Sequence, residues 1–463
     1  MGKVTVTFLG ATATVTGSRF LIASEKSKIL VDAGLFQGLK EDRKKNWDPF
    51  PVEPSTIDAI VLTHAHLDHC GYLPLLVRQG FRNQIFATEY TIKLASVILR
   101  DSGRLQMEDA EFALRKGFSK HPIPLPLYNT NDVEKTLNRF STVEFRTKTQ
   151  IAPDAWVTHF PSGHILGSAF ILLEIDGKSL LFTGDMGRGN HPLLASPDRP
   201  PQIALDVVVT ESTYGNRVHE TPARSFADEI NAAIKRGGSI LIPAFAVDRT
   251  EVILMTLREL IASHSIPNIP IYVDSPMALT ALEYYRDAVR EDSPELAAGV
   301  AERWKSEDPF DSGKLNQMHT IAQSKSLNEL KETSIIISAS GMATGGRVVH
   351  HLAHMLPNVK NTVILVGFQA AGSRGRSLEE GKKEIKMYGK WVPVHAHVVK
   401  VESFSVHADS DELISWLRNI SHPKETFVVH GEPDAEDVLA VRLRDELGWK
   451  ATIPKTAQVY EVG

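Results

Sequence analysis

The chain has 463 residues, which is enough for two or three domains, and a net charge of −5 at pH 7. Its 42% hydrophobic and 23% charged residues are typical of a globular protein, and no apolar run approaches the roughly 20 residues of a membrane-spanning helix. A protein coated in positive charge is excluded, so any nucleic acid must bind a local basic patch. With one cysteine, Cys70, and a strand pattern that begins at Val4 where a signal peptide would lie, we expect a cytoplasmic protein with no membrane partner. Composition leaves monomer and homodimer open.

The first residues predict a short β-meander. Residues 4–9, 20–22 and 28–31 have the apolar or alternating patterns of strands. Asp32 follows the third of them and precedes a glycine turn. A carboxylate in this position either caps the turn or orients other polar side chains, and the residues alone leave both roles open.

The densest group of metal-binding side chains lies at residues 63–69, Thr-His-Ala-His-Leu-Asp-His. Imidazole and carboxylate are ligands that zinc prefers. Residues 57–62 predict a buried strand and residues 71–76 the start of a helix, so we expect these ligands on a tight strand-to-helix loop. One metal could not easily take all four side chains, whereas two neighbouring metals could. The expected pairs are His64 with His66, and Asp68 with His69.

Two further candidate ligands follow a region with helical patterns at 90–99 and 105–115. They are His164, in Ser-Gly-His-Ile-Leu-Gly-Ser, and Asp185, in Leu-Leu-Phe-Thr-Gly-Asp-Met-Gly. Each lies between a predicted strand and glycines, where the backbone can turn sharply and present one side chain. Taken alone, His164 is as readily a structural histidine as a ligand.

From about residue 206 the pattern changes to apolar strands that alternate with helices, which predicts a parallel sheet covered on both faces. The strand-rich pattern returns at about residue 392. We therefore expect an α/β domain at 206–392, inserted into a first domain formed by residues 1–205 and 393–463.

The 63–69 loop resembles the HxHxDH signature of the metallo-β-lactamase superfamily, which binds two metals at the edge of an αββα sandwich. The insertion resembles the β-CASP domain of nucleic-acid-processing members, so the predicted fold is α/β: a metallo-β-lactamase αββα sandwich with an inserted β-CASP domain. The resemblance covers essentially the whole chain and is nearest to bacterial and archaeal relatives of the pre-mRNA 3′-end cleavage endonuclease subunit. The matching stretches are 211–215 (ESTYG), 243–246 (PAFA), 274–278 (DSPMA), 338–342 (SASGM), 403–409 (SFSVHAD) and 427–432 (FVVHGE).

This resemblance implies two zinc ions and assigns seven ligands. The first ion would be bound by His64, His66, His164 and Asp185. The second would be bound by Asp68, His69, His430 and Asp185, which bridges the two ions. Asp32 would orient the metal-bound histidines. His430 stands where DNA-processing relatives carry valine, which places the chain with the RNA-processing branch.

The implied activity is hydrolysis of phosphodiester bonds in single-stranded RNA, in RNA processing or decay, by a hydroxide that bridges the two zinc ions. The RNA would lie in the cleft between the two domains. His407 would be the general acid for the leaving ribose oxygen, held by Glu211. Ribonuclease J relatives, which can work from a 5′ end, carry an additional C-terminal domain that we do not expect in this chain, which favours internal cutting.

Substrate contacts are expected from the inserted domain. A loop at 338–347 follows a strand and precedes a helix, a setting that suits phosphate binding by backbone N–H groups and hydroxyls; a flexible glycine loop is the alternative. The expected contacts are Ser338, Ser340, Gly341, Met342, Arg249, Arg374 and Arg376, with Lys382 and Lys383 adding local positive charge. Alternatives for the whole protein are a catalytically silent RNA-binding scaffold and a metallohydrolase that acts on DNA or a small ester.

Overall fold

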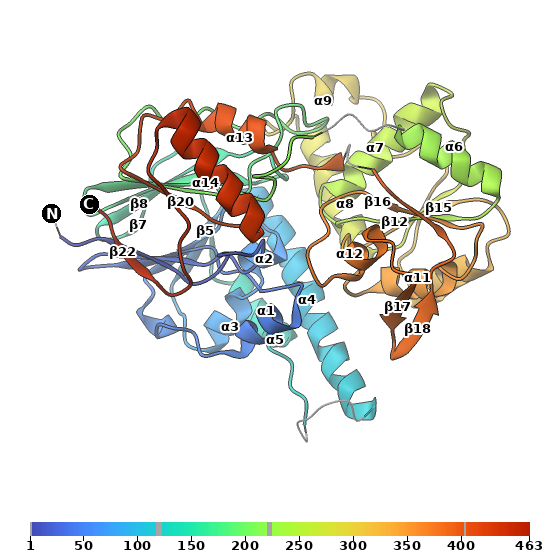
Figure 1. Cartoon of the computed structure of the whole chain (residues 1–463), viewed down its shortest axis with the longest axis horizontal. Helices are drawn as coiled ribbons and strands as arrows, with labels where there is room; N and C mark the ends of the chain where they lie inside the picture. The colour runs from blue at the N-terminus through green and yellow to red at the C-terminus, as the bar shows by residue number, and fades with distance from the viewer. Residues whose placement is uncertain (1, 117–122, 220–224, 402–403) are drawn as a thin grey trace. The chain divides into compact units, whose positions relative to one another are not determined.

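A computed structural model describes residues 2–116, 123–219, 225–401 and 404–463 (Figure 1). Ser403 of the 403–409 motif lies outside these ranges. The chain divides into two compact units: unit 1 comprises residues 1–218 and 407–463, and unit 2 comprises residues 219–406. None of the helices in the described ranges is both long and apolar enough to cross a bilayer.

Unit 1 contains two seven-stranded sheets that share one apolar core. The first runs β22-β1-β2-β3-β4-β5-β6, with bounds Val459–Glu461, Thr5–Phe8, Phe20–Ala23, Lys28–Val31, Ala59–Val61, Gln84–Ala87 and Phe140–Thr142. The second runs β21-β20-β11-β10-β9-β8-β7, with bounds Ala451–Thr452, Glu425–Val428, Val207–Thr210, Lys178–Phe182, Ala169–Ile175, Ala155–Pro161 and Thr149–Ala152. In β1, Val6 and Phe8 are buried in the shared core while Thr5 and Thr7 are half-buried, as the two-residue period of a strand dictates.

Helices cover the outer faces of both sheets. On the second sheet, Leu172 and Leu181 pack with Leu413 and Leu443 of helices α13 (Ser410–Leu417) and α14 (Pro433–Leu447). Figure 1 shows helices α1, α3 and α5 beyond the first sheet. Unit 1 is therefore the predicted αββα sandwich. Its remaining helices are α1 (Lys40–Lys44), α2 (Leu67–Cys70), α3 (Leu73–Arg78), α4 (Glu89–Lys116) and α5 (Thr130–Leu137).

Helix α4 is continuous where the sequence pattern predicted two helices, at 90–99 and 105–115. Gly103 lies at the expected break, and a Cβ there would be 3.0 Å from the Val133 side chain of α5, so the glycine permits close packing. Arg104 also forms ion pairs with Asp101 and Glu108, one on each side of it. Such pairs, three and four residues apart, support a helix through the region.

Unit 2 is built on a six-stranded sheet in which every neighbouring pair is parallel, as predicted. Its order is β14-β13-β15-β12-β16-β19, with bounds Leu315–Gln317, Ile271–Val273, Ile335–Ser338, Ile240–Pro243, Thr362–Leu365 and His397–Lys400. The central strands β12, β15 and β16 are buried throughout, which explains their unbroken apolar sequence. A separate hairpin pairs β17 (Glu384–Met387) with β18 (Lys390–Pro393). The helices of this unit are α6 (Phe226–Arg236), α7 (Arg249–Ala262), α8 (Pro276–Arg290), α9 (Val300–Arg303), α10 (Ile321–Ser326), α11 (Arg347–Met355) and α12 (Arg374–Glu379).

The boundaries of the compact units differ from the predicted ones at both junctions. Strand β11, expected to open the insertion, pairs with β10 and β20 in unit 1. Strand β19, expected to follow the insertion, pairs with β16 in unit 2. Both strands pair in parallel inside a mixed or parallel sheet, so their sequence patterns do not reveal which sheet they join.

Gly34 touches the loop that carries the first predicted ligands. A Cβ at this position would lie 1.5 Å from the carbonyl oxygen of Asp68. We expect Gly34→Ala to displace the loop and to lower the free energy of unfolding by about 3 kcal/mol or more. Gly189→Ala is the matched control, because no atom of the described residues lies within 4 Å of a Cβ there. Equal denaturation midpoints for the two variants would contradict this prediction.

Candidate metal centre

The predicted ligands converge because each follows the carboxyl end of a strand in unit 1. His64 follows β4 in the first sheet, while His164, Asp185 and His430 follow β8, β10 and β20 in the second. In the second sheet these three strands run in the same direction, so their carboxyl ends lie at one edge. The two facing sheets thus bring residues from position 64 to position 430 to one place.

A first group consists of four side chains whose ligand atoms all lie within 4.8 Å of one another: His64, His66, His164 and Asp185. The Nδ1 atom of His66 is 3.1 Å from His64 Nε2 and 3.2 Å from His164 Nε2. Asp185 Oδ2 is 3.5 Å from His64 Nε2. Zinc binds nitrogen and oxygen at about 2.0–2.2 Å, which places tetrahedral ligands about 3.3–3.6 Å apart. The three distances in this group are close to that range, so a small adjustment of the side chains would accommodate one zinc ion.

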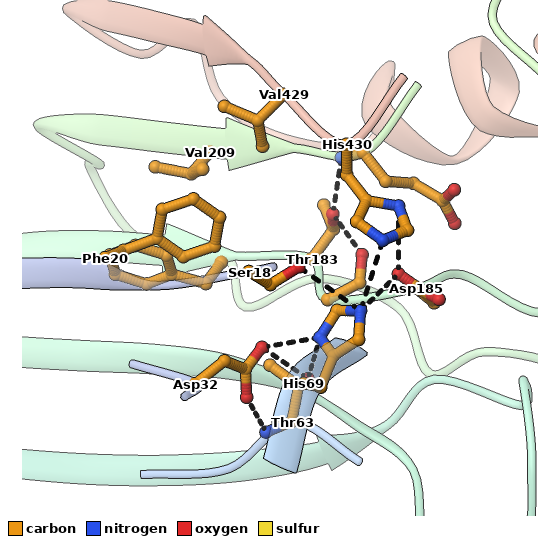
Figure 2. Close-up of a pocket in the computed structure, with 13 residues that line it drawn as sticks. Ser18, Phe20, Asp32, Thr63, His69, Thr183, Asp185, Val209, Val429 and His430 are labelled. Carbon is orange, nitrogen blue, oxygen red and sulfur yellow. Dashed lines mark hydrogen bonds and ion pairs between the residues drawn. The ribbon is translucent and has the colours of Figure 1, made fainter. Parts of the chain in front are cut away.

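A second group adjoins the first and contains Asp68, His69 and His430. His430 Nε2 is 3.3 Å from His69 Nε2 and 3.6 Å from Asp68 Oδ2. The other oxygen of Asp185, Oδ1, is 3.3 Å from His69 Nε2 (Figure 2). This Oδ1 atom is buried and accepts no hydrogen bond from any residue that the structure describes. A buried anionic oxygen facing two imidazoles suits a cation, so the residues fit a second ion.

Oxygen atoms on the far side of the rings contact three of these histidines, His64, His69 and His430. His69 Nδ1 donates to Asp32 Oδ2 at 2.8 Å, and Figure 2 shows His69 between Asp32 and Asp185. Thr63 Oγ1 donates to the same carboxylate at 2.8 Å and lies 3.1 Å from His64 Nδ1. These contacts leave the Nε2 atoms directed at the ligand groups.

The contacts of two threonines in this arrangement were not predicted from the sequence. Thr63 contacts Asp32 and His64, and the hydroxyl of Thr213 lies 3.2 Å from His430 Nδ1. Each is next to a predicted motif, Thr63 directly before His64 and Thr213 two residues after Glu211. Adjacency to a ligand was the available signal, although a hydroxyl neighbour is common enough in loops to carry little weight by itself.

Burial lowers the pKa of three histidines in the first group. The pKa values of His64 and His164 lie well below the usual value, through burial and repulsion by neighbouring imidazoles, and burial lowers the pKa of His66 to about 4. Neutral imidazole is the metal-binding form, so these rings are ready to bind a metal near neutral pH.

The second group has the opposite electrostatics. Burial opposes charge on His69, but Asp185 and Asp32 outweigh it and raise its pKa well above the usual value. The pKa of His430 is raised in the same way, by Asp185 and Asp68 against burial. Both shifts favour the charged imidazoles in the metal-free protein, whereas metal binding requires neutral rings.

His407 lies beside the two groups without belonging to either. Its Nδ1 atom is 3.3 Å from Glu211 Oε2 and 4.0 Å from Asp185 Oδ2. The other Glu211 oxygen accepts a hydrogen bond from the backbone of Met186, and the Glu211 carboxylate also lies within 4.8 Å of ligand atoms of Asp185 and His430. The His407 side chain is 16% exposed, so a substrate can reach it.

The residues predicted to contact RNA lie in unit 2. Their loop, with Ser338, Ser340, Gly341 and Met342, joins β15 to α11, while Arg249 begins α7 and Arg374 and Arg376 lie in α12. The arginines make hydrogen bonds to backbone carbonyls. Arg249 donates to Val366, Arg374 to Ala343 and Thr344, and Arg376 to Gln369. They thus support loop backbones, and their contact with RNA stays a prediction.

Family models match three regions of the chain. They are the metallo-beta-lactamase superfamily at residues 15–214, the Beta-Casp domain at 250–378, and the Zn-dependent metallo-hydrolase RNA specificity domain at 391–454. A crystal structure of a protein of unknown function from Enterococcus faecalis has a similar fold, with a TM-score of 0.53 and 13% identity over 99% of this chain and 100% of that one.

Curated relatives match along most of their length. Ribonuclease TTHA0252 of Thermus thermophilus is 34% identical over 92% of both chains. The RNase J-like protein of Methanocaldococcus jannaschii is 32% identical over 89% of this chain and 88% of that protein. Transcription termination factor FttA of Methanosarcina mazei is 31% identical over 93% of this chain and 67% of its own length.

The αββα sandwich and its ligand groups define a metallo-hydrolase with the metallo-β-lactamase fold, and the resemblance predicted from the motifs is confirmed. The second unit adds the inserted domain. The chain belongs to the β-CASP family of metallo-hydrolase ribonucleases.

Replacement of His430 tests the second ligand group. His430→Ala removes one of the two imidazoles of this group, so we expect bound zinc to fall from about two ions per chain to about one. Inductively coupled plasma mass spectrometry of the dialysed protein measures the zinc content. His407→Ala is the matched control, since His407 adjoins both groups but belongs to neither. Two retained ions in His430→Ala would contradict the assignment.

Proposed function

We propose that the protein is a zinc-dependent ribonuclease that hydrolyses phosphodiester bonds of single-stranded RNA in RNA processing or decay. The observation that carries this proposal is the Asp185 carboxylate, which faces the first ligand group with one oxygen and the second with the other. The match of residues 391–454 to an RNA specificity domain supports RNA as the substrate. When bound, two zinc ions supply Lewis acidity that activates water near neutral pH and offsets charge on a phosphate.

In this proposal His407 is the general acid. Hydrolysis leaves a ribose 3′-oxygen that needs a proton, and an imidazolium donates near pH 7. Glu211 Oε2, 3.3 Å from His407 Nδ1, accepts the hydrogen bond from that nitrogen and fixes the orientation of the ring. Nε2 then carries the proton that is transferred. Asp32 and Thr63 act only by holding the ligand rings.

The alternatives are less well supported. A catalytically silent scaffold would be expected to lack ligands, whereas the seven predicted ligand residues all belong to the two groups. Histidine at position 430 disfavours a DNA nuclease. A position for RNA between the two domains, internal cutting, the cytoplasmic location and the oligomeric state stay predictions.

RNA cleavage is tested directly with the zinc-loaded protein. We expect it to cut a 5′-labelled single-stranded RNA at least about tenfold faster than the matched DNA, and to lose activity in excess chelator. A ladder of labelled fragments would indicate internal cutting, and accumulation of labelled mononucleotide would indicate cutting from the 5′ end. If RNA stays intact across pH 6–9 with two zinc equivalents, the proposed function is wrong.

His407→Ala separates proton donation from metal binding. Loss of a general acid lowers rates by about 10²- to 10⁴-fold, so we expect kcat to fall within that range while zinc content stays at two per chain. His422 is a histidine of unit 1 that is hydrogen-bonded to the Gly448 carbonyl, and His422→Ala should leave kcat unchanged. Zinc loss from His407→Ala would instead make His407 a ligand.

A further inference from the structure

The β17–β18 hairpin of unit 2 presents an aromatic and basic face that the catalytic proposal does not use. Trp391 is 61% exposed and stands directly opposite Lys386 in the antiparallel register. Directly opposite residues share one face of a hairpin, so the indole and the ammonium group are neighbours on the outer side. In Figure 1 the hairpin extends from the part of unit 2 that contains α11.

The hairpin is firmly attached by its inner face. Ile385 and Met387 are buried in a cluster with Val348 and Leu352 of α11. Tyr388, at the turn, stacks on His350 of the same helix, with ring centroids 4.7 Å apart and planes at 25°. A ligand on the outer face would therefore meet a preorganised surface, which lowers the entropic cost of binding.

The charge of the hairpin is strongly positive in a chain whose net charge is −5. Residues 381–393 contain four lysines and one glutamate. Among the described residues, Lys383, Lys386 and Lys390 are exposed and form no ion pair. Exposed ammonium groups attract a negatively charged polymer, and an exposed indole stacks on flat rings. Together they favour binding of a polyanion that carries such rings.

The hairpin is also continuous with the loop predicted to bind phosphate. The Arg374 guanidinium donates to the carbonyl oxygens of Ala343 and Thr344 in that loop and to that of Lys386 in β17. One side chain thus connects the two backbones, and both belong to the same unit.

We propose that the outer face of this hairpin binds single-stranded RNA, with a base stacked on Trp391 and backbone phosphates paired with Lys383, Lys386 and Lys390. The proposal rests on the ribonuclease function proposed above and adds a binding surface to it. Stacking on one aromatic ring needs no particular base, so the surface has little sequence preference.

The test uses the zinc-loaded full chain and a 20-nucleotide oligouridylate. Loss of one stacking partner weakens binding about 5- to 150-fold, so we expect Trp391→Ala to raise KM in that range, well beyond any fall in kcat. Lys386→Ala should raise KM less and make KM less dependent on salt. The matched controls are Trp47→Ala, whose indole is equally 61% exposed, and Lys331→Ala, at an exposed lysine before β15; both should behave as the unaltered protein.

A second measurement, with 4-thiouridine in the same RNA, locates the contact independently of turnover. Crosslinks in the peptide containing residues 384–393 support the proposal, even if the RNA is never cut and the ribonuclease proposal fails. RNA cleavage with unchanged KM in both hairpin variants, and no crosslink there, would overturn the hairpin proposal and leave the ribonuclease proposal standing. A change in mass by light scattering for Trp391→Ala, with KM unchanged, would identify a protein contact instead and also overturn it.

Discussion

The carboxylate of Asp185 is the constraint on which the rest of unit 1 depends. One of its oxygens is 3.5 Å from His64 and 3.6 Å from His164, and the other is 3.3 Å from His69 and 3.5 Å from His430. Burial favours the protonated acid, but the imidazoles of His430, His69 and His64 outweigh burial and hold the pKa of Asp185 well below the usual value. Two cations side by side repel each other, and a shared anion offsets that repulsion.

Two residues of the candidate metal centre adopt an unfavourable backbone conformation. Asp32 and His430 have φ angles of +58° and +54°, a region that residues other than glycine seldom adopt and that recurs at functional sites. Backbone hydrogen bonds hold both in place, from Asp32 to Val61 and from His430 to Ala11. These contacts tie the ligand loops to the strands of the sandwich, so the positions of the imidazoles follow from sheet packing rather than from the loops alone.

Sequence reasoning identified candidate site residues where metal-binding side chains are concentrated along the chain and where motifs match the family. The 63–69 loop predicts a two-metal site by itself, while His164, Asp185, His407 and His430 needed the family resemblance, because spacing cannot pair residues so far apart. The threonines beside the ligands were missed since their role exists only in three dimensions. The hydrogen bonds of the arginines in unit 2 were also not predicted. Their charges suggested phosphate contacts, and in the structure they donate to backbone carbonyl oxygens. The predicted domain boundaries differ from those of the compact units because a buried parallel strand has the same apolar sequence pattern in either sheet.

The late position of His430 has a consequence for synthesis. Strand β20, which carries His430, lies between β11 and β21, so the second sheet gains this member only after the whole of unit 2 has been translated. A ribosome-bound chain that ends before residue 430 lacks an imidazole of the second ligand group. The second ligand group can therefore be completed only after all of unit 2 has been synthesised, so assembly of the centre follows translation of the inserted domain.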